Sequence, residues 1–324
     1  MTGSPPPRHL AWLLALLLLP GCARATADEP GAPPAAVLRA VELWREEPGR
    51  RDVGELEILG AWELRGGREG FGGFSGMAFD GEHLLVASDR GWLWQARPAF
   101  AGDGTLLRLD FWQVERLRFA GAGRARDVEE LLVDADGSQH VLLERVHAIA
   151  GRPAGSTGPM KAVKLPAPLD AAPSNEGIEA AARLADGSLL LLSEGQRTDD
   201  GAHRAALLKE GRARLLGYRP AAGFRPTGAA RLGRWLFVVE RRVSLLAGLE
   251  GRIAALDLDA LPPVQGAVLE GRELARLGGR TISDNVEAIA ARPGPDGAIH
   301  LFVLSDDNFS ILQETLLLQL AWRP

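Results

Sequence analysis

The sequence of 324 residues lacks the side chains that several common kinds of site require. Its single cysteine, Cys22, excludes an intrachain disulfide and a cysteine-ligated zinc site. The six histidines are scattered without metal-ligand spacing, and a net charge of -5 gives no basic footprint for bulk nucleic acid. There is also no Walker lysine and no G-x-S-x-G nucleophile motif. Any chemistry must therefore come from carboxylates, arginines, lysines and hydroxyls.

The sequence also has no apolar run long enough to span a bilayer, which needs about 20 residues. Its longest run, residues 10–19, follows a short basic segment and predicts a signal peptide. Leu-Pro-Gly-Cys at 19–22 resembles a bacterial lipobox, which predicts lipidation of Cys22. Ala-Arg-Ala at 23–25 offers ordinary signal peptidase an alternative site, which would leave a soluble secreted protein.

We therefore expect an exported protein, either a periplasmic or membrane-anchored lipoprotein or a soluble periplasmic or secreted one. The expected division is a signal peptide at 1–25, a flexible spacer and lead-in at 26–50, and one folded domain at 51–324. The membrane is reached only through the lipid anchor.

One pattern recurs five times in the folded domain: an acidic or small residue, an apolar strand, a turn, and a second apolar strand ending in an acid. Four of the turns carry Asp-Gly and the remaining one has Gly233. Asp-Gly between apolar runs is a strong hairpin signal, because glycine accepts the positive φ of tight turns. The copies begin at Ser75, Glu129, Glu176, Thr227 and Glu287.

The starts of the copies lie 54, 47, 51 and 60 residues apart, close to the length of a propeller blade. This spacing predicts an all-β propeller of four-stranded blades, five of them counted, rather than a β-sandwich or a β-helix. The last copy still needs an outer strand, and residues 55–64 can supply it by pairing the two ends of the chain. Residues 37–44 leave a sixth blade open.

The hairpins predict where charged side chains gather. The first residue of one strand lies beside the last residue of the next, which brings two columns to one end of every hairpin. If these hairpins line the channel, up to eight carboxylates surround one opening. They are Glu129, Glu176 and Glu287 of the first predicted column, and Asp89, Glu144, Glu194, Glu240 and Asp306 of the second.

So many like charges require compensation. Arg90, Arg145 and Arg241 directly follow acids of the second predicted column. In a structural interpretation these arginines pair with the acids and form a rigid ring. In a functional interpretation the eight carboxylates hold a divalent cation, Ca²⁺, and the arginines orient an anionic substrate. Glu176 and Glu287 are then expected to take part in catalysis together with the three arginines.

Several phrases are similar to those of a bacterial family known as phytase-like, or "esterase-like activity of phytase", over residues 72–320. The resemblance implies a propeller and an exported location. The related phytases hold several calcium ions in an acidic face, where substrate phosphate bridges the metals. The phrases are Gly72–Gly76, Ser88–Gly91, Ser174–Glu179, Phe224–Thr227, Glu240–Arg242, Asp284–Glu287 and Leu304–Phe309, with Gln313.

From the residues and the resemblance together we expect a metal-dependent hydrolase of phosphoesters or related esters. Its partners would be a small anionic or ester substrate and no nucleic acid, and the protein would be a monomer. Two alternatives stay open: a non-catalytic propeller that binds a cell-envelope partner, and a lactonase-type propeller enzyme. The long connection at 151–174, with Lys161 and Lys164, fits a binding loop and plain surface equally well.

Overall fold

The computed structural model describes residues 36–67, 70–122, 127–171, 177–244, 248–261, 264–310 and 313–324. Regular structure in these residues is β-strand apart from three short 3₁₀ helices, and none of the helices found there could cross a membrane. The expected signal peptide and lipidation at Cys22 lie outside the described residues and stay predictions. The 3₁₀ helices are η1 (Leu169–Ala171), η2 (Leu258–Ala260) and η3 (Pro295–Gly297).

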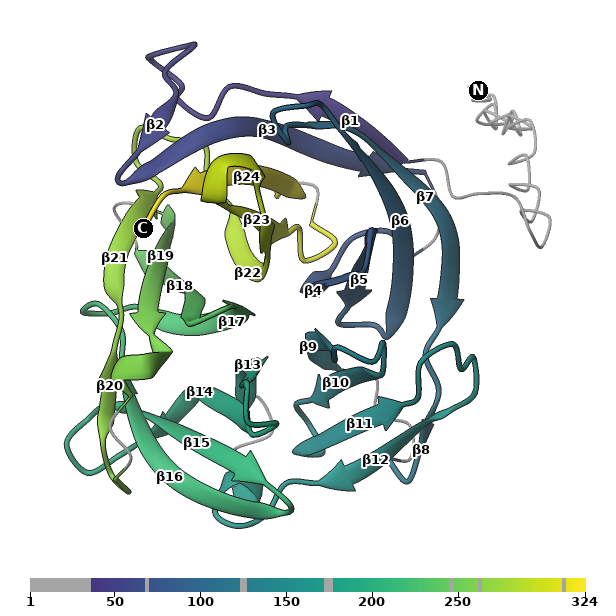
Figure 1. Ribbon diagram of the computed structural model, residues 1–324, viewed down its shortest axis with the longest axis vertical. Helices are drawn as coiled ribbons and strands as arrows, with labels where there is room; N and C mark the ends of the chain where they lie inside the picture. Colours follow the sequence, from purple (N-terminus) through teal and green to yellow (C-terminus); the bar gives the residue numbers. More distant parts are fainter. Residues whose placement is uncertain are drawn as a thin grey trace, which may run out of the picture. The chain divides into compact units, whose positions relative to one another are not determined.

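Five antiparallel sheets, arranged as a ring, form the five blades of a propeller (Figure 1). Blade 1 comprises β4 (Phe74–Asp80), β5 (His83–Ser88), β6 (Trp92–Phe100) and β7 (Leu106–Arg116). Blade 2 comprises β9 (Val128–Val133), β10 (Gln139–Leu143), β11 (Ala148–Arg152) and β12 (Met160–Lys164), with β8 (Phe119–Ala120) added in parallel outside β12. The predicted all-β propeller is confirmed, with five blades.

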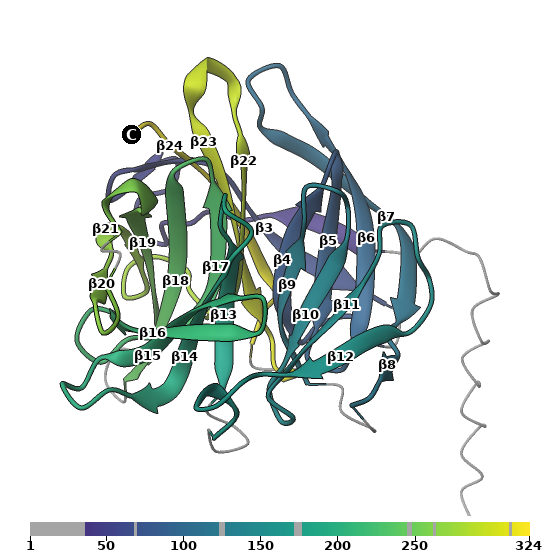
Figure 2. The ribbon, with the colours of Figure 1, turned by 60° about the horizontal axis from the view of Figure 1, so that its bottom comes forward.

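The other three blades follow the same plan. Blade 3 comprises β13 (Ile178–Arg183), β14 (Leu189–Arg197), β15 (His203–Lys209) and β16 (Arg212–Arg219), with β20 (Val268–Glu270) outside β16. Blade 4 comprises β17 (Arg225–Leu232), β18 (Trp235–Ser244), β19 (Gly248–Asp257) and β21 (Arg272–Leu277). Blade 5 comprises β22 (Asn285–Pro293), β23 (Ile299–Asp306), β24 (Leu316–Trp322), β3 (Leu56–Gly66) and β1 (Ala36–Ala40), with β2 (Asp52–Val53) paired to β3. Figure 2 shows the β22–β23 hairpin projecting beyond the neighbouring strands.

Blade 5 closes the ring with strands from both ends of the chain. β3 lies between β24 and β1 and is hydrogen-bonded to both, as expected of residues 55–64. β1 is therefore the outermost strand of blade 5 and does not start a sixth blade. It also shows that the sheet begins within the range expected to be spacer and lead-in.

Each of the five apolar core clusters lies between two neighbouring blades. In β14, for example, Leu190 and Leu192 pack in the cluster shared with blade 4, whereas Leu189 and Leu191 pack in the cluster shared with blade 2. Alternate residues of a strand point to opposite faces of the sheet. The blade is covered on both faces, which is why its strands read as continuous apolar runs in the sequence.

All five inner strands carry a β-bulge at the same place. The register between each inner strand and its neighbour skips one residue close to the start of the strand. A bulge leaves the extra residue unpaired and redirects its side chain. The five skipped residues, here called the bulge positions, are Ser75, Glu129, Glu179, Thr227 and Glu287.

Candidate metal centre at the channel mouth

The bulge positions correct the first predicted column at one residue. In blade 3 the structure puts Glu179 at the bulge, and Glu176, which the sequence analysis chose, lies outside the described residues. The sequence held a signal for Glu179. It stands seven residues before Asp186 of its turn, as Glu129 stands seven residues before Asp136.

The two hydroxyl residues at the bulge positions join neighbouring blades. The Ser75 hydroxyl donates a hydrogen bond to the backbone carbonyl of Val128, and the Thr227 hydroxyl donates one of 2.8 Å to that of Val286. An ionised carboxylate cannot donate in this way. Glu129, Glu179 and Glu287 instead interact electrostatically with one another, so they share one space.

The second predicted column is also off by one residue, in blade 4. The residues paired with the strand just before each bulge are Ser88, Leu143, Ser193, Glu240 and Ser305. Each of these is buried within its blade. The residues that follow them, here called the mouth positions, are Asp89, Glu144, Glu194, Arg241 and Asp306.

Glu240 therefore does not lie at the opening, contrary to expectation. Its carboxylate accepts hydrogen bonds from Tyr218 and, at 2.7 Å, from Arg252 Nη1, and its side chain is fully buried. A shift of one residue along a strand moves a side chain to the other face. The same shift brings Arg241 into the position that the sequence analysis gave to an acid.

Eight carboxylates gather around this end of the channel and are called the acidic mouth. Burial raises the pKa of Glu129 and Glu179 well above the ordinary value, and the neighbouring negative charges add to the effect. Burial likewise raises the pKa of Glu287 to about 8 and that of Asp306 to about 7. The eight are Asp89, Asp127, Glu129, Glu144, Glu179, Glu194, Glu287 and Asp306.

Arg241 neutralises one half of the acidic mouth. Its guanidinium donates to Glu287, to Asn285 Oδ1 at 2.6 Å and to Glu194 Oε1 at 2.9 Å. These contacts raise the pKa of Arg241, although burial opposes the change. Glu194 and Glu287 thus have a fixed counter-ion supplied by the chain.

Among the described residues, the other half has a paired cation at its rim, where the exposed Arg145 contacts Asp127, and none at its centre. One carboxylate oxygen from each of Asp127, Glu129 and Glu144 lies within 4.8 Å of the other two. Burial raises the pKa of Asp89, and its buried Oδ1 has no hydrogen-bond partner among the described residues. Hard oxygen donors in this number suit Ca²⁺, which binds them at about 2.3–2.6 Å. The donor set therefore fits the expected divalent cation.

Three arginines lie on the rim of the acidic mouth with their side chains exposed. Arg145 pairs with Asp127, and Arg225 Nη1 is 3.7 Å from Glu194 Oε1. The Arg90 guanidinium lies over the Phe309 ring, 3.4 Å from its centroid, and its charge lowers the pKa of Asp89 against the larger effect of burial. The rim is positive and accessible, whereas the centre is negative and buried.

Two of the phrases that carried the family resemblance meet beside Asp89. The Gly73 amide donates to Asp307 Oδ1 at 3.0 Å, and Asp307 also accepts from Phe309 and Thr315. A side chain at Gly73 would collide with the Phe309 ring and with Asp89. Glycine is required here because the loop after β23 packs against the backbone. The contact holds Asp89 and Asp306 at the mouth.

Below the acidic mouth the channel is closed around Glu130, which the sequence analysis missed. The Glu130 carboxylate accepts hydrogen bonds from the backbone N–H groups of Leu131 and Ala229, both at 3.0 Å, and of Ala181, at 3.4 Å. These three donors belong to three different blades. Burial raises its pKa well above the ordinary value. In the other four blades the equivalent residue is small, and a Cβ at Gly228 would collide with the carbonyl of Glu287. The inner strands therefore approach one another most closely at this level.

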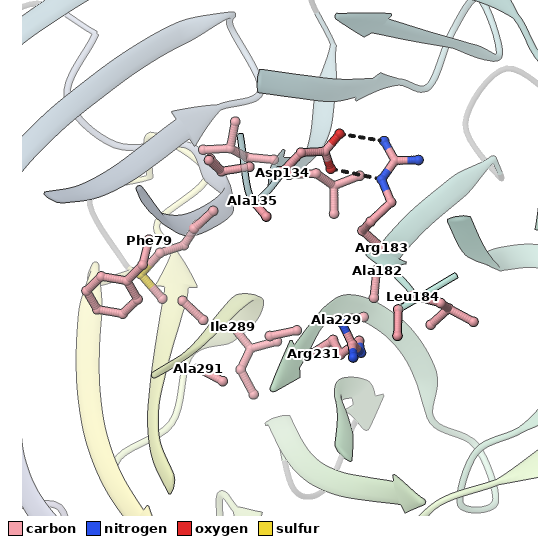
Figure 3. Close-up of a pocket in the computed structure, with 18 residues that line it drawn as sticks. Phe79, Asp134, Ala135, Ala182, Arg183, Leu184, Ala229, Arg231, Ile289 and Ala291 are labelled. Carbon is pink, nitrogen blue, oxygen red and sulfur yellow. Dashed lines mark hydrogen bonds and ion pairs between the residues drawn. The ribbon is translucent and has the colours of Figure 1, made fainter. Parts of the chain in front are cut away.

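The opposite end of the channel is a separate cavity of about 330 Å³ with a different lining (Figure 3). It is lined mainly by apolar residues such as Leu131 and Ile289. Asp134 and Arg183 form a two-pronged ion pair at its edge, with N–O distances of 2.8 and 3.1 Å. No cluster of acids comparable with the acidic mouth is found there among the described residues.

A sequence comparison identifies the family. The model described as Phytase-like, "Esterase-like activity of phytase", matches residues 69–309. The chain belongs to this family. No curated protein matches the chain by sequence.

Solved structures with a similar fold are distant from this Phytase-like chain. A virginiamycin B lyase from Staphylococcus aureus has 14% identity and a TM-score of 0.40, covering 83% of this chain and 85% of its own. A candidate gluconolactonase has 13% identity and a TM-score of 0.43, covering 90% and 94%. The Cps50 (Swd1) β-propeller domain of Myceliophteria thermophila has 11% identity and a TM-score of 0.38, covering 87% and 99%.

Proposed function

We propose that the acidic mouth binds Ca²⁺ and that the protein hydrolyses phosphoesters or related esters of small anionic molecules. The observation that carries the proposal is the group formed by Asp127, Glu129 and Glu144 within 4.8 Å. Oxygens bound to one Ca²⁺ are separated by up to about 5 Å, so this group needs little rearrangement. Membership of the Phytase-like family supports a hydrolytic role.

Asp127, Glu129 and Glu144 would hold the cation, with the unpartnered Asp89 Oδ1 as a further ligand. Bound there, Ca²⁺ would lower the pKa of a water molecule and stabilise negative charge as it develops. Glu194 and Glu287 already bind Arg241, so we assign them to positioning the mouth. The exposed Arg145 and Arg225 would orient the anionic substrate.

The other residues that the sequence predicted at the site have different roles in this proposal. Arg241 is a positioning residue, because its guanidinium is occupied by Glu194, Glu287 and Asn285. Asp306 Oδ1 accepts a hydrogen bond of 2.8 Å from the backbone N–H of Asn308. Its carboxylate interacts with Asp89 at the edge of the proposed site. A part for Arg90 in orienting the anion, and one for Glu176, stay predictions.

The test is hydrolysis by the purified protein, measured with added Ca²⁺ and with chelator. The substrates are a panel of phosphomonoesters including phytate, carboxylic esters and lactones. Calcium-dependent release of phosphate or of an ester alcohol supports the proposal. Turnover of lactones alone would favour a lactonase-type enzyme. A lack of turnover on every substrate would favour a propeller that only binds an envelope partner.

Matched variants connect any activity to the acidic mouth. Glu129→Gln and Glu144→Gln keep the side-chain shape and remove a ligand charge, so both should lose at least tenfold in activity at low Ca²⁺. Asp110→Asn, which removes one exposed acid paired with Arg108 on blade 1, is the control. Equal activity in all three variants would reject the assignment of the site.

A further inference from the structure

All three lysines of the chain lie in one place. Of 37 basic residues only Lys161, Lys164 and Lys209 are lysines. All three line one groove of about 840 Å³, a size ordinary for a small-molecule site. The groove runs between blades 2 and 3, and none of its lining residues belongs to the acidic mouth. We call it the lysine groove.

The floor of the lysine groove is apolar and continues the core between the two blades. Ile149 and Val163 are paired directly across β11 and β12, and Ile149 packs against the cluster formed with Leu189 and Leu191. Val163 is nevertheless 60% exposed, so its side chain is open to solvent in the groove. The groove therefore presents apolar side chains to solvent beside the core that the two blades share.

The rim of the lysine groove carries an excess of positive charge. Arg152 forms an ion pair with Glu115, and Arg183 forms one with Asp134. Lys209 Nζ lies 3.2 Å from Asp186 Oδ2. Lys161 and Lys164 are both exposed, and no ion pair joins either of them to a carboxylate of the described residues. Asp134 and Glu210 also line the groove, so its lining has five basic and two acidic side chains in a chain with a net charge of -5, an imbalance that favours anions.

We propose that the lysine groove binds an anionic amphiphile, a fatty-acid carboxylate with its acyl chain on the floor and its head group beside Lys161 and Lys164. A small anion would leave the apolar floor exposed. A neutral apolar molecule would make no use of the lysines. An acyl chain with a terminal carboxylate matches both parts of the groove, because burial of its CH₂ groups on the floor is favourable and its head group can pair with Lys161 and Lys164.

The experiment is isothermal titration of the purified protein with dodecanoate and with dodecanol. The Lys161→Gln/Lys164→Gln variant should bind dodecanoate at least tenfold more weakly and dodecanol as well as the wild type does. Arg108→Gln/Arg276→Gln, which removes two exposed charges elsewhere, is the control and should bind both as the wild type does. Thermal unfolding of both variants checks that they are folded.

The proposal is overturned if the wild type shows no saturable binding of dodecanoate. It is also overturned if the lysine variant and the arginine control weaken dodecanoate binding equally, since net charge alone would then explain the loss. Acetate, which has the head group without the chain, should not bind. The result is independent of hydrolysis, because no residue of the acidic mouth is involved.

Discussion

The carboxyl groups of Glu144 and Glu179 interact electrostatically across the boundary between blades 2 and 3. Burial raises the pKa of Glu179, and the negative charge of Glu144 adds to this effect. Glu144 also accepts the Gly177 amide at 3.2 Å, which fixes one of its oxygens. This pair of acids lies at the group that we propose as the metal site, of which Glu144 is a member.

The first prediction is that binding of Ca²⁺ releases protons. Burial raises the pKa of Glu129, Glu144 and Glu179, and a bound cation would favour their ionised forms. The apparent affinity for Ca²⁺ should therefore increase as pH increases above the ordinary titration range of carboxyl groups. Calorimetric titration in two buffers of different ionisation enthalpy measures the number of protons released. An identical heat in both buffers would contradict the prediction.

The second prediction concerns stability without metal. Glu287 and Asp306 have pKa values near 8 and 7 in the folded protein against ordinary values of 4.5 and 3.8, so the folded state holds more protons between those limits. Stability must then decrease as pH rises through this window. The melting temperature of the chelated protein should fall between pH 5 and pH 8, and Ca²⁺ should restore it at pH 8.

Glu287→Gln tests the cause of this second effect. Glutamine cannot titrate, so the variant should lose less stability than the wild type between pH 5 and pH 8. Asp110→Asn, far from the acidic mouth, should follow the wild type. A melting temperature of the chelated wild type that rises steadily over this range would reject the account.

The third prediction separates Glu240 from the acids of the mouth. Glu240→Gln breaks a buried pair with Arg252, a change that typically costs about 3–5 kcal/mol of stability, and it should leave Ca²⁺ affinity unchanged. Glu129→Gln should do the opposite, with weaker Ca²⁺ binding and little loss of stability. Urea unfolding and calorimetric titration measure the two quantities. Loss of Ca²⁺ affinity in Glu240→Gln would restore that residue to the site.

The hairpins and the closure of the ring could be predicted because their signals are local. Gly81, Gly137, Gly187, Gly233 and Gly297 all adopt positive φ in the five turns where the sequence pattern placed them. The strand that closes the ring was predicted because the last copy of the pattern lacks an outer strand for its four-stranded blade. The bulges, in contrast, leave no mark in composition, yet each adds one residue to the count. Glu240 was chosen in place of Arg241 because it is the acid that directly follows the apolar run of its strand, whereas the strand register places Arg241 at the mouth.

Glu130 could not be predicted because its partners are backbone groups far away in the chain. Ala181 and Ala229 are 51 and 99 residues from it. Every alanine has a backbone N–H, so the sequence does not indicate that these two donate to Glu130. In the sequence Glu130 is one of two adjacent glutamates, and only the bulge decides which one points into the mouth. Such a contact is visible only when the blades are assembled.

The fourth prediction tests this contact. Glu130→Ala removes the acceptor for three backbone N–H groups, and each buried group left unsatisfied costs about 1–3 kcal/mol. The free energy of unfolding should decrease by several kcal/mol, measured by urea denaturation. Glu82→Ala, in an exposed turn, should have little effect. A decrease of less than about 0.5 kcal/mol would show that water replaces the carboxylate.

Because the channel is closed at the level of Glu130, the acidic mouth is a pocket that does not continue to the far end of the ring. A substrate that enters it cannot leave through the far end of the ring, so its products must depart by the route of entry. A released anion would meet the exposed side chains of Arg145 and Arg225 on its way out. Substrate and product would thus pass the same positively charged rim, and the product would compete with the substrate for these arginines.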